Sequence, residues 1–275
     1  LFRSSNVTSV TEIVIDPSVK IDSGALTGAS SVTELTVYNS NSLTVDGEES
    51  LSGSNITTLN IKVLETTLTE EFMKKFVNLS ELKTINVEKG IDTIKEKAFA
   101  NFTKLEKLSM ADATVIDVSA LPLLDNEYTT KVTLTGDKDQ VEFTLNIANN
   151  NNSNAYSTLK KSFLDCFEYD KITKVTLSEN FKLVAESAFS AYTKLNYIDF
   201  GANSKITNIG TNAFVGAFEL GNLDVVGPTL TSSVIYEQFN MSKGLYHDRK
   251  SYNGETDIGS YYVNLDYRAT GNKAP

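Results

Sequence analysis

The segment Leu82-Lys83-Thr84-Ile85-Asn86-Val87 carries the pattern that decides the fold, with an aliphatic residue at its first, fourth and sixth positions. The segment Leu105-Glu106-Lys107-Leu108-Ser109-Met110 repeats this pattern 23 residues later. The last two aliphatic residues of each segment alternate with a polar residue, as they do in a short β-strand, so they point to the same side. Each segment therefore predicts one short strand with one buried face.

Nine such triplets follow one another along the chain, and one of them, Thr129/Val132/Leu134, is degenerate at its first position. The first positions are separated by 22, 24, 26, 23, 24, 43, 23 and 25 residues, and all but one separation lie in the window of about 20–29 residues that is typical of leucine-rich repeats. A coil of this length cannot bury its own apolar face, so stability must come from stacking coil on coil. The other triplets begin at Val10, Val32, Ile56, Leu82, Leu105, Ile172, Leu195 and Leu220.

A second pattern precedes several triplets and is clearest at 94–102, 184–192 and 209–218. In each copy an alanine is followed by a phenylalanine, and a second aromatic residue lies three or four positions further on. The alanine permits close approach of neighbouring coils, and aromatic residues at this spacing share one face of a helix. The pattern predicts a short helical turn in each coil.

The combination I-x-x-x-A-F-x-x-x-x-x-L-x-x-I-x-[LVI] resembles the BspA-like class of leucine-rich repeats, found in bacterial and protist surface proteins, over roughly residues 7–226. The resemblance implies an α/β leucine-rich-repeat solenoid, with short parallel strands on its concave face and short helical turns on its convex face. It also implies an extracellular or cell-surface location. The chain departs from the family in lacking the usual cysteine before the L-x-x-I triplet, and the Thr129 copy has no Ala-Phe turn.

Two regions depart from the repeat. In the 43-residue interval, alternating residues at 132–147 predict a hairpin, Asn149–Asn154 predict a polar loop, and Tyr156–Tyr169 predict an amphipathic helix. We therefore expect a solenoid over residues 1–226, with an insertion at about 135–170 that is either a tolerated loop expansion or a binding element. Residues 227–275 hold six of the twelve tyrosines, and are expected to form a C-terminal cap, a degenerate repeat, or a surface on which sugars or peptides stack.

The sequence contains little that indicates catalysis, metal binding or binding to nucleic acid or membranes. A net charge of −10 works against binding to nucleic acid or anionic headgroups, and no apolar stretch approaches 18 residues, so no membrane insertion is expected. The single cysteine, Cys166, is predicted to be buried, and His247 has no nucleophile near it in sequence. Nucleotide-binding and zinc-hydrolase motifs are absent. We predict no catalytic residue, no metal site and no cofactor. The start at Leu1, without an initiator methionine or signal-peptide pattern, suggests a trimmed mature segment.

The spacing also predicts which side chains line the outer side of the strands. The residues between the buried positions form a central column that runs from Val14 to Asp224, and the column before it changes from acidic at Glu12 to basic at Lys174. Such a surface suits hydrogen bonding to an extended polar partner, either peptide or glycan, although it also fits a merely soluble face. The candidate binding residues are Thr36, Tyr38, Asn60, Asn86, Lys107, Ser109, Lys131, Thr133, Lys174, Thr176, Tyr197 and Asp199.

The leading hypothesis is a non-catalytic recognition or adhesion module that binds an extracellular protein or glycan through the concave face. One alternative is a polysaccharide-active enzyme on a parallel β-helix, whose coils have similar length. Appreciable helix content would argue against it, and release of reducing ends from glycans would support it. Another alternative is a structural spacer for a domain outside this sequence.

Overall fold

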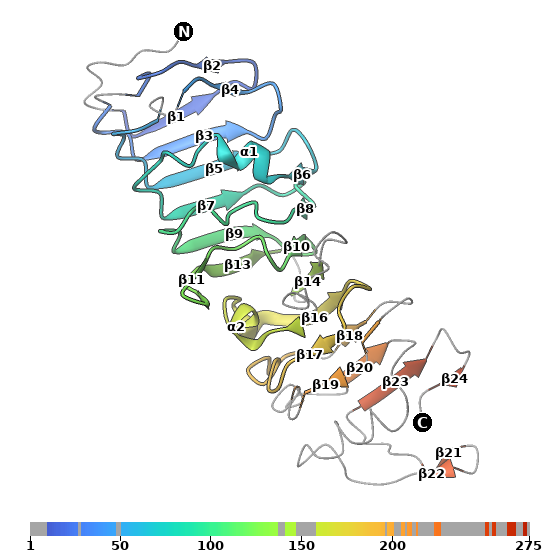
Figure 1. Ribbon diagram of the computed structural model, residues 1–275. Helices are drawn as coiled ribbons and strands as arrows, with labels where there is room; N and C mark the ends of the chain where they lie inside the picture. The colour runs from blue at the N-terminus through green and yellow to red at the C-terminus, as the bar shows by residue number, and fades with distance from the viewer. Residues whose placement is uncertain are drawn as a thin grey trace. The chain divides into compact units, whose positions relative to one another are not determined.

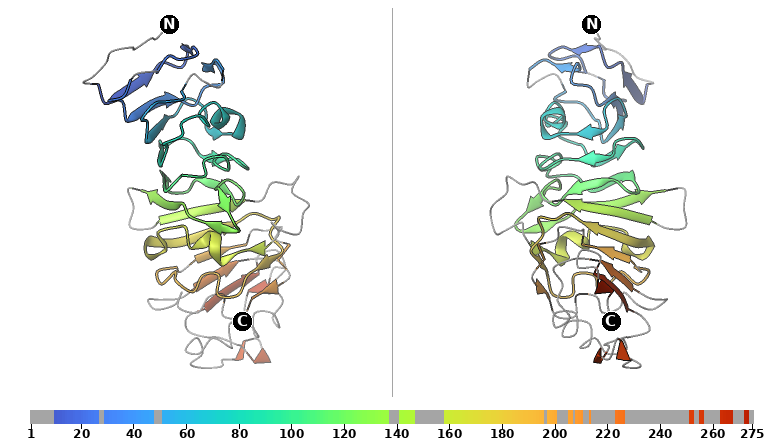
Figure 2. Two further views of the ribbon diagram at one scale, coloured as in Figure 1. Left: turned by 60° about the vertical axis from the view of Figure 1, so that its left-hand side comes forward. Right: turned by 90° about the vertical axis from the view of Figure 1, so that its right-hand side faces the viewer.

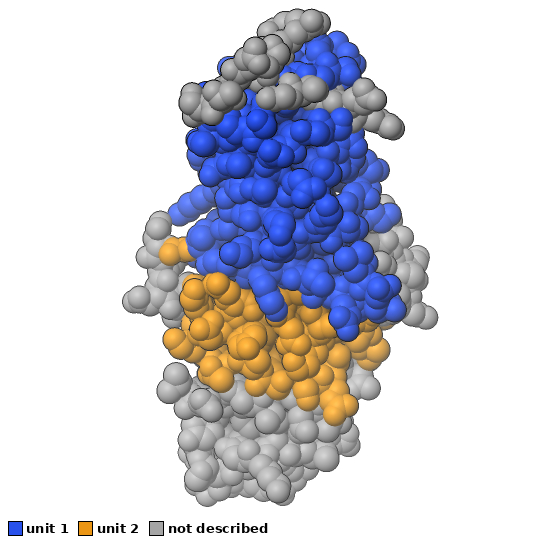
Figure 3. Space-filling model, turned by 90° about the vertical axis from the view of Figure 1, so that its left-hand side faces the viewer, with its two compact units in different colours: residues 1–114, 119–135 blue, residues 115–118, 136–275 orange. Residues whose placement is uncertain are grey.

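The computed structural model describes most of the chain up to residue 213 and a few strands beyond it. It divides into unit 1, residues 1–114 and 119–135, and unit 2, residues 115–118 and 136–275 (Figure 3). The described residues are 10–26, 29–47, 51–136, 141–146, 158–195, 197–200, 205–206, 208–210, 213, 223–226, 251–252, 255–256, 263–267 and 272–273.

Unit 1 is built on a six-stranded parallel sheet with one strand from each coil, stacked in chain order (Figures 1 and 2). The fourth triplet positions lie in register along this sheet. They are at most 1% exposed from the second strand onward, at Leu35, Leu59, Ile85, Leu108 and Val132, and Ile13 in the first strand is 8% exposed. The predicted aliphatic spine is therefore confirmed for unit 1. The strands are β1 (Glu12–Ile15), β3 (Glu34–Tyr38), β5 (Thr58–Lys62), β7 (Thr84–Val87), β9 (Lys107–Ala111) and β13 (Lys131–Thr135).

The remainder of each coil in unit 1 adds narrow parallel pairs. The strand β2 (Lys20–Ile21) pairs with β4 (Thr44–Val45), and β6 (Thr67–Leu68) pairs with β8 (Thr93–Ile94). The helix α1 (Glu70–Lys74) follows β6, and its first turn is capped by Thr69, whose Oγ1 accepts a hydrogen bond from the Phe72 amide at 3.2 Å. The cap explains why a helix of only five residues forms here.

A short antiparallel hairpin, β11 (Leu123–Leu124) with β12 (Glu127–Tyr128), replaces the Ala-Phe turn in the coil between β9 and β13. Asp125 and Asn126 have φ values of 48° and 67°, which are typical of a two-residue type I′ turn. Residues 123–127 are all exposed, whereas the flanking Pro122 and Thr130 are buried. Thr130 Oγ1 also donates to Leu105 O at 3.0 Å, so the hairpin is anchored at its base and uncovered at its tip.

The Ala-Phe segments form successive turns, so the prediction of a helical turn at 94–102 and 184–192 is wrong. The residues before the alanine, Lys97 and Ser187, have φ values of 57° and 54°, and Gly24 at the matching position has 72°. A left-handed residue interrupts a right-handed helix, because the helix needs negative φ at every position. Ala98 and Phe99 are nevertheless buried, as the pattern predicted.

Unit 2 stacks a second series of parallel strands, with β24 (Asn272–Lys273) added antiparallel at the end. A narrower parallel stack joins β15 (Thr158–Leu159), β17 (Leu183–Val184) and β19 (Asn208–Ile209), and β21 (Ser251–Tyr252) pairs antiparallel with β22 (Glu255–Thr256). The main strands are β10 (Val115–Asp117), β14 (Val141–Asn146), β16 (Ile172–Leu177), β18 (Tyr197–Asp199), β20 (Leu223–Val226) and β23 (Val263–Tyr267).

The hairpin predicted at 132–147 is wrong, because β13 pairs in parallel with β9, while β14 pairs in parallel with β10 and β16. Phe143 and Leu145 lie in register with Val175 and Leu177, so β14 occupies the place of a repeat strand. Alternation of apolar and polar residues predicts a strand but does not identify its partner.

The helix predicted at Tyr156–Tyr169 is also wrong in extent. Within the described residues of that segment, α2 (Lys161–Leu164) is the only α-helix, and the short 3₁₀ helix η1 (Tyr169–Lys171) follows it. The predicted apolar positions are buried, because this segment forms part of a coil, and Phe167 stacks on Phe143 at 4.5 Å between ring centroids. The predicted polar loop at 149–154 lies outside the described residues.

The prediction of a C-terminal cap or degenerate repeat at 227–275 is not tested by the described residues. Val225 lies in register with Ile198, two positions away from the Leu223 that the triplet spacing placed there. The strand β23 adds a further parallel strand beside β20. Tyr252 and Tyr267 lie in β21 and β23, and the other C-terminal tyrosines lie outside the described residues, so the cap remains a prediction.

Candidate functional site

The central column predicted for unit 1 is present on the sheet face opposite the aliphatic spine. Successive strands place its members side by side as register neighbours. Because alternate residues of a strand point to opposite faces, these side chains share the outer face of the sheet. We call them the polar row: Thr36, Asn60, Asn86, Ser109 and Thr133.

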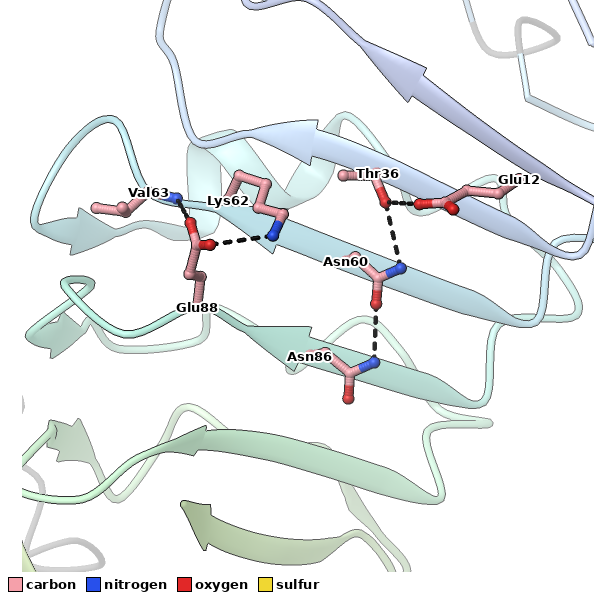
Figure 4. Close-up of polar contacts among 7 residues, drawn as sticks. All are labelled: Glu12, Thr36, Asn60, Lys62, Val63, Asn86 and Glu88. Carbon is pink, nitrogen blue, oxygen red and sulfur yellow. Dashed lines mark hydrogen bonds and ion pairs between the residues drawn. The ribbon is translucent and has the colours of Figure 1, made fainter. Parts of the chain in front are cut away.

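The first half of the polar row is joined by hydrogen bonds between coils (Figure 4). Asn86 Nδ2 donates to Asn60 Oδ1 at 2.8 Å, and Asn60 Nδ2 donates to Thr36 Oγ1 at 3.2 Å. Thr36 Oγ1 donates in turn to Glu12 Oε1 at 2.8 Å, and Asn60 Nδ2 also lies 3.4 Å from Glu34 Oε2. Three of the predicted binding residues therefore already bond to one another across strands, which stabilises the stacking of coils. We call this half the polar ladder.

The second half of the polar row has a different character. Lys107 is the register neighbour of Lys131, and Ser109 is the register neighbour of Thr133. Both lysines are exposed, and Ser109 and Thr133 are half-buried on the same face. We call these four residues the lysine end.

Two like charges directly opposite each other on neighbouring strands are destabilising. Two other lysines of unit 1 face carboxylates of the next coil. Lys62 Nζ lies 3.0 Å from Glu88 Oε1, and Lys83 Nζ lies 2.7 Å from Glu106 Oε1. Lys107 instead lies in register with another lysine, Lys131.

Tyr38, a further candidate, is half-buried and lies in register with Lys62. The hydrogen bond and charge of Glu88 raise the pKa of Lys62. Glu88 also accepts a hydrogen bond from the Val63 amide at 2.9 Å, and this bond, with a smaller contribution from Lys62, lowers the pKa of Glu88 (Figure 4). Tyr38 thus lies beside Lys62, whose charge is already compensated by Glu88.

The four candidates in unit 2 form a separate group. Lys174 is in register with Tyr197, and Thr176 with Asp199. Lys174 Nζ lies 3.0 Å from Glu142 Oε2 and 5.4 Å from the centre of the Tyr197 ring, so its charge is compensated on both sides. The pairing of Glu142 was missed by sequence reasoning, because β14 was assigned to a hairpin.

The predicted column does not pass from Lys131 to Lys174 as neighbours on one sheet. The strand of Lys131 pairs with β9, whereas the strand of Lys174 pairs with β14 and β18. Asp224, placed in the central column by its spacing, lies instead in register with Tyr197. The structure therefore brings together eight of the twelve candidates on the sheet of unit 1 and four on that of unit 2.

A further polar side chain, Asn39, was not identified from the sequence and is 3% exposed. Its Oδ1 accepts hydrogen bonds from the amides of Leu64 at 2.6 Å and Glu65 at 2.9 Å, and its Nδ2 donates to Glu65 O at 2.6 Å. The side chain therefore holds the turn of the next coil. A single asparagine after a strand gives no signal that would separate this role from an ordinary turn.

The described part of the chain contains no group of three or more His, Cys, Asp and Glu residues that could hold a metal ion. Cys166 is buried, and its Sγ lies 3.6 Å from Ser162 O, so it packs as a small apolar side chain. His247 lies outside the described residues. Among the residues that were placed, no helix is long and apolar enough to cross a membrane.

Comparison with known families accounts for the stacked coils and the repeated triplets. The model of the BspA type leucine rich repeat region matches six copies, over residues 2–121 and 145–245. The chain belongs to this BspA-type leucine-rich repeat family. A comparison with curated proteins finds no match. Repeats of the BspA type are often involved in binding or adhesion and are generally non-catalytic. The family match omits residues 122–144, which include the β11–β12 hairpin and β13.

Proposed function

We propose that this BspA-type repeat chain is a non-catalytic recognition or adhesion module. It binds an extracellular or cell-surface protein or glycan through the polar row of unit 1, and the lysine end makes the main contacts. The outer face that carries this row is, in this proposal, the concave face of the solenoid. The observation that carries the proposal is the register of Lys107 with Lys131, two exposed like charges on neighbouring strands.

The distribution of hydrogen-bond partners supports Lys107 and Ser109, rather than the polar ladder, as ligand contacts. Asn60 and Thr36 each use their side chains to bond neighbouring coils. A ligand that displaced these bonds would have to replace them before it gained affinity. Lys107 and Ser109 have no side-chain hydrogen bond or ion pair with any residue that the structure describes. Contacts to a ligand at these positions cost no existing bond.

The chemistry of the row favours an extended polar partner. Hydroxyl and amide side chains offer hydrogen bonds but no large apolar anchor, whereas tight protein interfaces usually depend on a few buried aromatic or arginine side chains. We therefore expect modest affinity spread over several coils. The group around Lys174 is expected to contribute little, because Glu142 and Tyr197 already surround its ammonium group.

The test is an array of immobilised glycans and extracellular-matrix proteins, probed with the full chain and with two charge-reversal variants. The first variant is Lys107→Glu/Lys131→Glu. The matched control is Lys83→Glu/Lys104→Glu, which makes the same change in net charge at lysines paired with Glu106 and Glu81. We expect the first variant to lose the signals of the wild type and the control to keep them.

Thermal unfolding of each variant establishes that it is folded before its signals are compared. Signals that survive in the Lys107→Glu/Lys131→Glu variant would contradict the proposed surface. New reducing ends released from a glycan on the array would favour a polysaccharide-active enzyme. Helix content cannot separate these functions, because the α-helices among the described residues are only the short α1 and α2. An array without any signal would favour a spacer.

A further inference from the structure

We propose that the outer face of β1 and β3 is a contact surface for an arginine side chain of a protein partner. This inference rests on the proposed role of the outer face in recognition and deepens it, because it names the partner as a protein. The four residues that carry it are Glu12 and Val14 on β1, and Glu34 and Tyr38 on β3. We call them the β1–β3 patch.

Two carboxylates lie side by side at one edge of the patch. Glu12 and Glu34 are register neighbours on parallel strands, and both are exposed. Glu12 Oε1 accepts a hydrogen bond from Thr36 Oγ1 at 2.8 Å (Figure 4), and Glu34 Oε2 lies 3.4 Å from Asn60 Nδ2. The other oxygen of each carboxylate has no partner among the residues that the structure describes. The polar ladder thus orients both groups and leaves one oxygen of each open to a ligand.

No lysine or arginine in the described part of the chain forms an ion pair with either carboxylate. The pKa of Lys62 is raised mainly by its hydrogen bond with Glu88 and least by the charge of Glu12, so Lys62 belongs to Glu88. Like charges opposite each other on neighbouring strands repel. A guanidinium group between Glu12 and Glu34 would relieve this repulsion and donate hydrogen bonds to both. The net charge of −10 adds a general attraction for a cation.

The other edge of the patch is apolar. Val14 is 61% exposed on the outer face, although Ile13 and Ile15 on either side of it are buried. Tyr38 is half-buried and lies diagonal to Val14, because it follows the register neighbour of Val14, Thr36, by two positions. Two strand positions span about 7 Å, so the aliphatic stem of an arginine bound at the carboxylates reaches Val14. The Tyr38 ring offers a further contact to the residues beside that arginine.

This combination favours a protein over a glycan. Glutamate and tyrosine side chains also bind neutral sugars, but a hydroxyl group does not compensate two adjacent negative charges. An acidic glycan would be repelled by Glu12 and Glu34. Arginine supplies a positive charge and an apolar stem in one side chain, which matches the carboxylates and Val14 together, and it is enriched among the residues that dominate protein interfaces.

Binding of the full chain to short soluble probes, measured by titration calorimetry at low salt, tests the inference. The probes are a glycine-spaced arginine peptide, the same peptide with citrulline, which keeps the shape and removes the charge, a cationic glucosamine oligosaccharide, and a neutral malto-oligosaccharide. We expect the arginine peptide to bind more tightly than the other three. The variant Glu12→Gln/Glu34→Gln should lose about tenfold or more in affinity for it, since charge-assisted hydrogen bonds are lost.

Two further variants locate the contact. The matched control Glu81→Gln/Glu106→Gln removes the same charge at carboxylates that are paired with Lys104 and Lys83, and it should leave binding unchanged. Val14→Thr keeps the shape and the charge of the patch and should weaken binding severalfold, because the apolar contact is reduced. Thermal unfolding establishes that each variant is folded.

The inference is overturned if the arginine peptide does not bind, if any other probe binds as tightly, or if Glu12→Gln/Glu34→Gln binds like the wild type. Equal losses in this variant and in its matched control would also overturn it, because they would indicate non-specific attraction. A signal on the array that depends on the lysine end, without binding of the arginine peptide, would leave the proposed function standing. Binding of the arginine peptide at the patch, without any signal that depends on the lysine end, would keep the inference and refute the lysine end as the main contact.

Discussion

Asn39 is a single buried side chain that bonds to four backbone groups of the next coil. We predict that Asn39→Ala lowers the free energy of unfolding by about 1–3 kcal/mol, because two amides and two carbonyls lose the partner that the buried Asn39 side chain supplies. Chemical denaturation measures this loss. The control is Asn41→Ala, since Asn41 is exposed and its side chain bonds to the Glu65 carboxylate and not to backbone groups of the turn. Equal losses in the two variants would contradict the role given to Asn39.

Glu88 gives unit 1 a pH-dependent contribution to stability. Its pKa is lowered from the ordinary value of 4.5, mainly by the hydrogen bond from the Val63 amide. A carboxyl whose pKa is lower in the folded state stabilises the fold above its unfolded pKa, and this contribution is lost as the pH falls through the folded pKa. We therefore predict that Glu88→Gln is less stable than the wild type at pH 7, and that the difference shrinks as the pH falls below 4.5. Urea denaturation across this range is the measurement, and a difference independent of pH would refute it.

At the scale of elements, β9 and β13 meet with like charges. Replacing Lys107 by glutamate puts opposite charges on neighbouring strands, so we predict that Lys107→Glu raises the free energy of unfolding by about 0.3 kcal/mol at low salt. Lys62→Glu is the opposite case, because it removes the ion pair with Glu88 and should destabilise. Denaturation at low and high salt distinguishes an electrostatic effect, which salt must reduce. If Lys107→Glu instead lowers the free energy of unfolding, Lys107 stabilises the fold, and its position beside Lys131 is not a loss of stability that binding would have to explain.

The strands themselves were predictable and the turns between them were not. The triplets predicted the strands of the unit 1 sheet because two buried aliphatic positions alternate with one polar position, as at Ile85 and Val87. The prediction of helical turns was wrong because Lys97 and Ser187 take a left-handed conformation. Neither residue type favours that conformation, so the sequence gives no sign of it. The pairing predicted for β14 was wrong because its alternation of apolar and polar residues fits a hairpin strand and a repeat strand equally well.

At the scale of the molecule, stability is expected to be a sum over neighbouring coils. Ile85 lies between β5 and β9 and is 0% exposed, whereas Ile13 lies in β1 at the end of the sheet and is 8% exposed. We predict that Ile85→Ala costs about 2–5 kcal/mol and Ile13→Ala distinctly less, because the inner coil loses packing on both sides. Thermal unfolding compares them. Similar costs would mean that the terminal coil is packed as fully as the inner ones.

The candidate site was predictable only where the register is simple. In unit 1 the triplets predicted the columns from Glu12 to Lys131 correctly, because each of these strands pairs with the strand of the next triplet. The column then broke at the 43-residue interval, since β16 pairs with β14, a strand absent from the list of triplets. The hydrogen bonds of the polar ladder could not be predicted from the sequence either, because they depend on side-chain geometry across three coils.

The β11–β12 hairpin has a practical consequence. Its tip at Asp125 and Asn126 is exposed, and the buried Pro122 and Thr130 fix its base. Exposed loop tips of this kind accept added sequence more readily than packed turns do. An epitope tag or a fluorophore inserted between Asp125 and Asn126 would therefore mark the molecule, or attach it to a surface in one orientation, while the aliphatic spine stays intact.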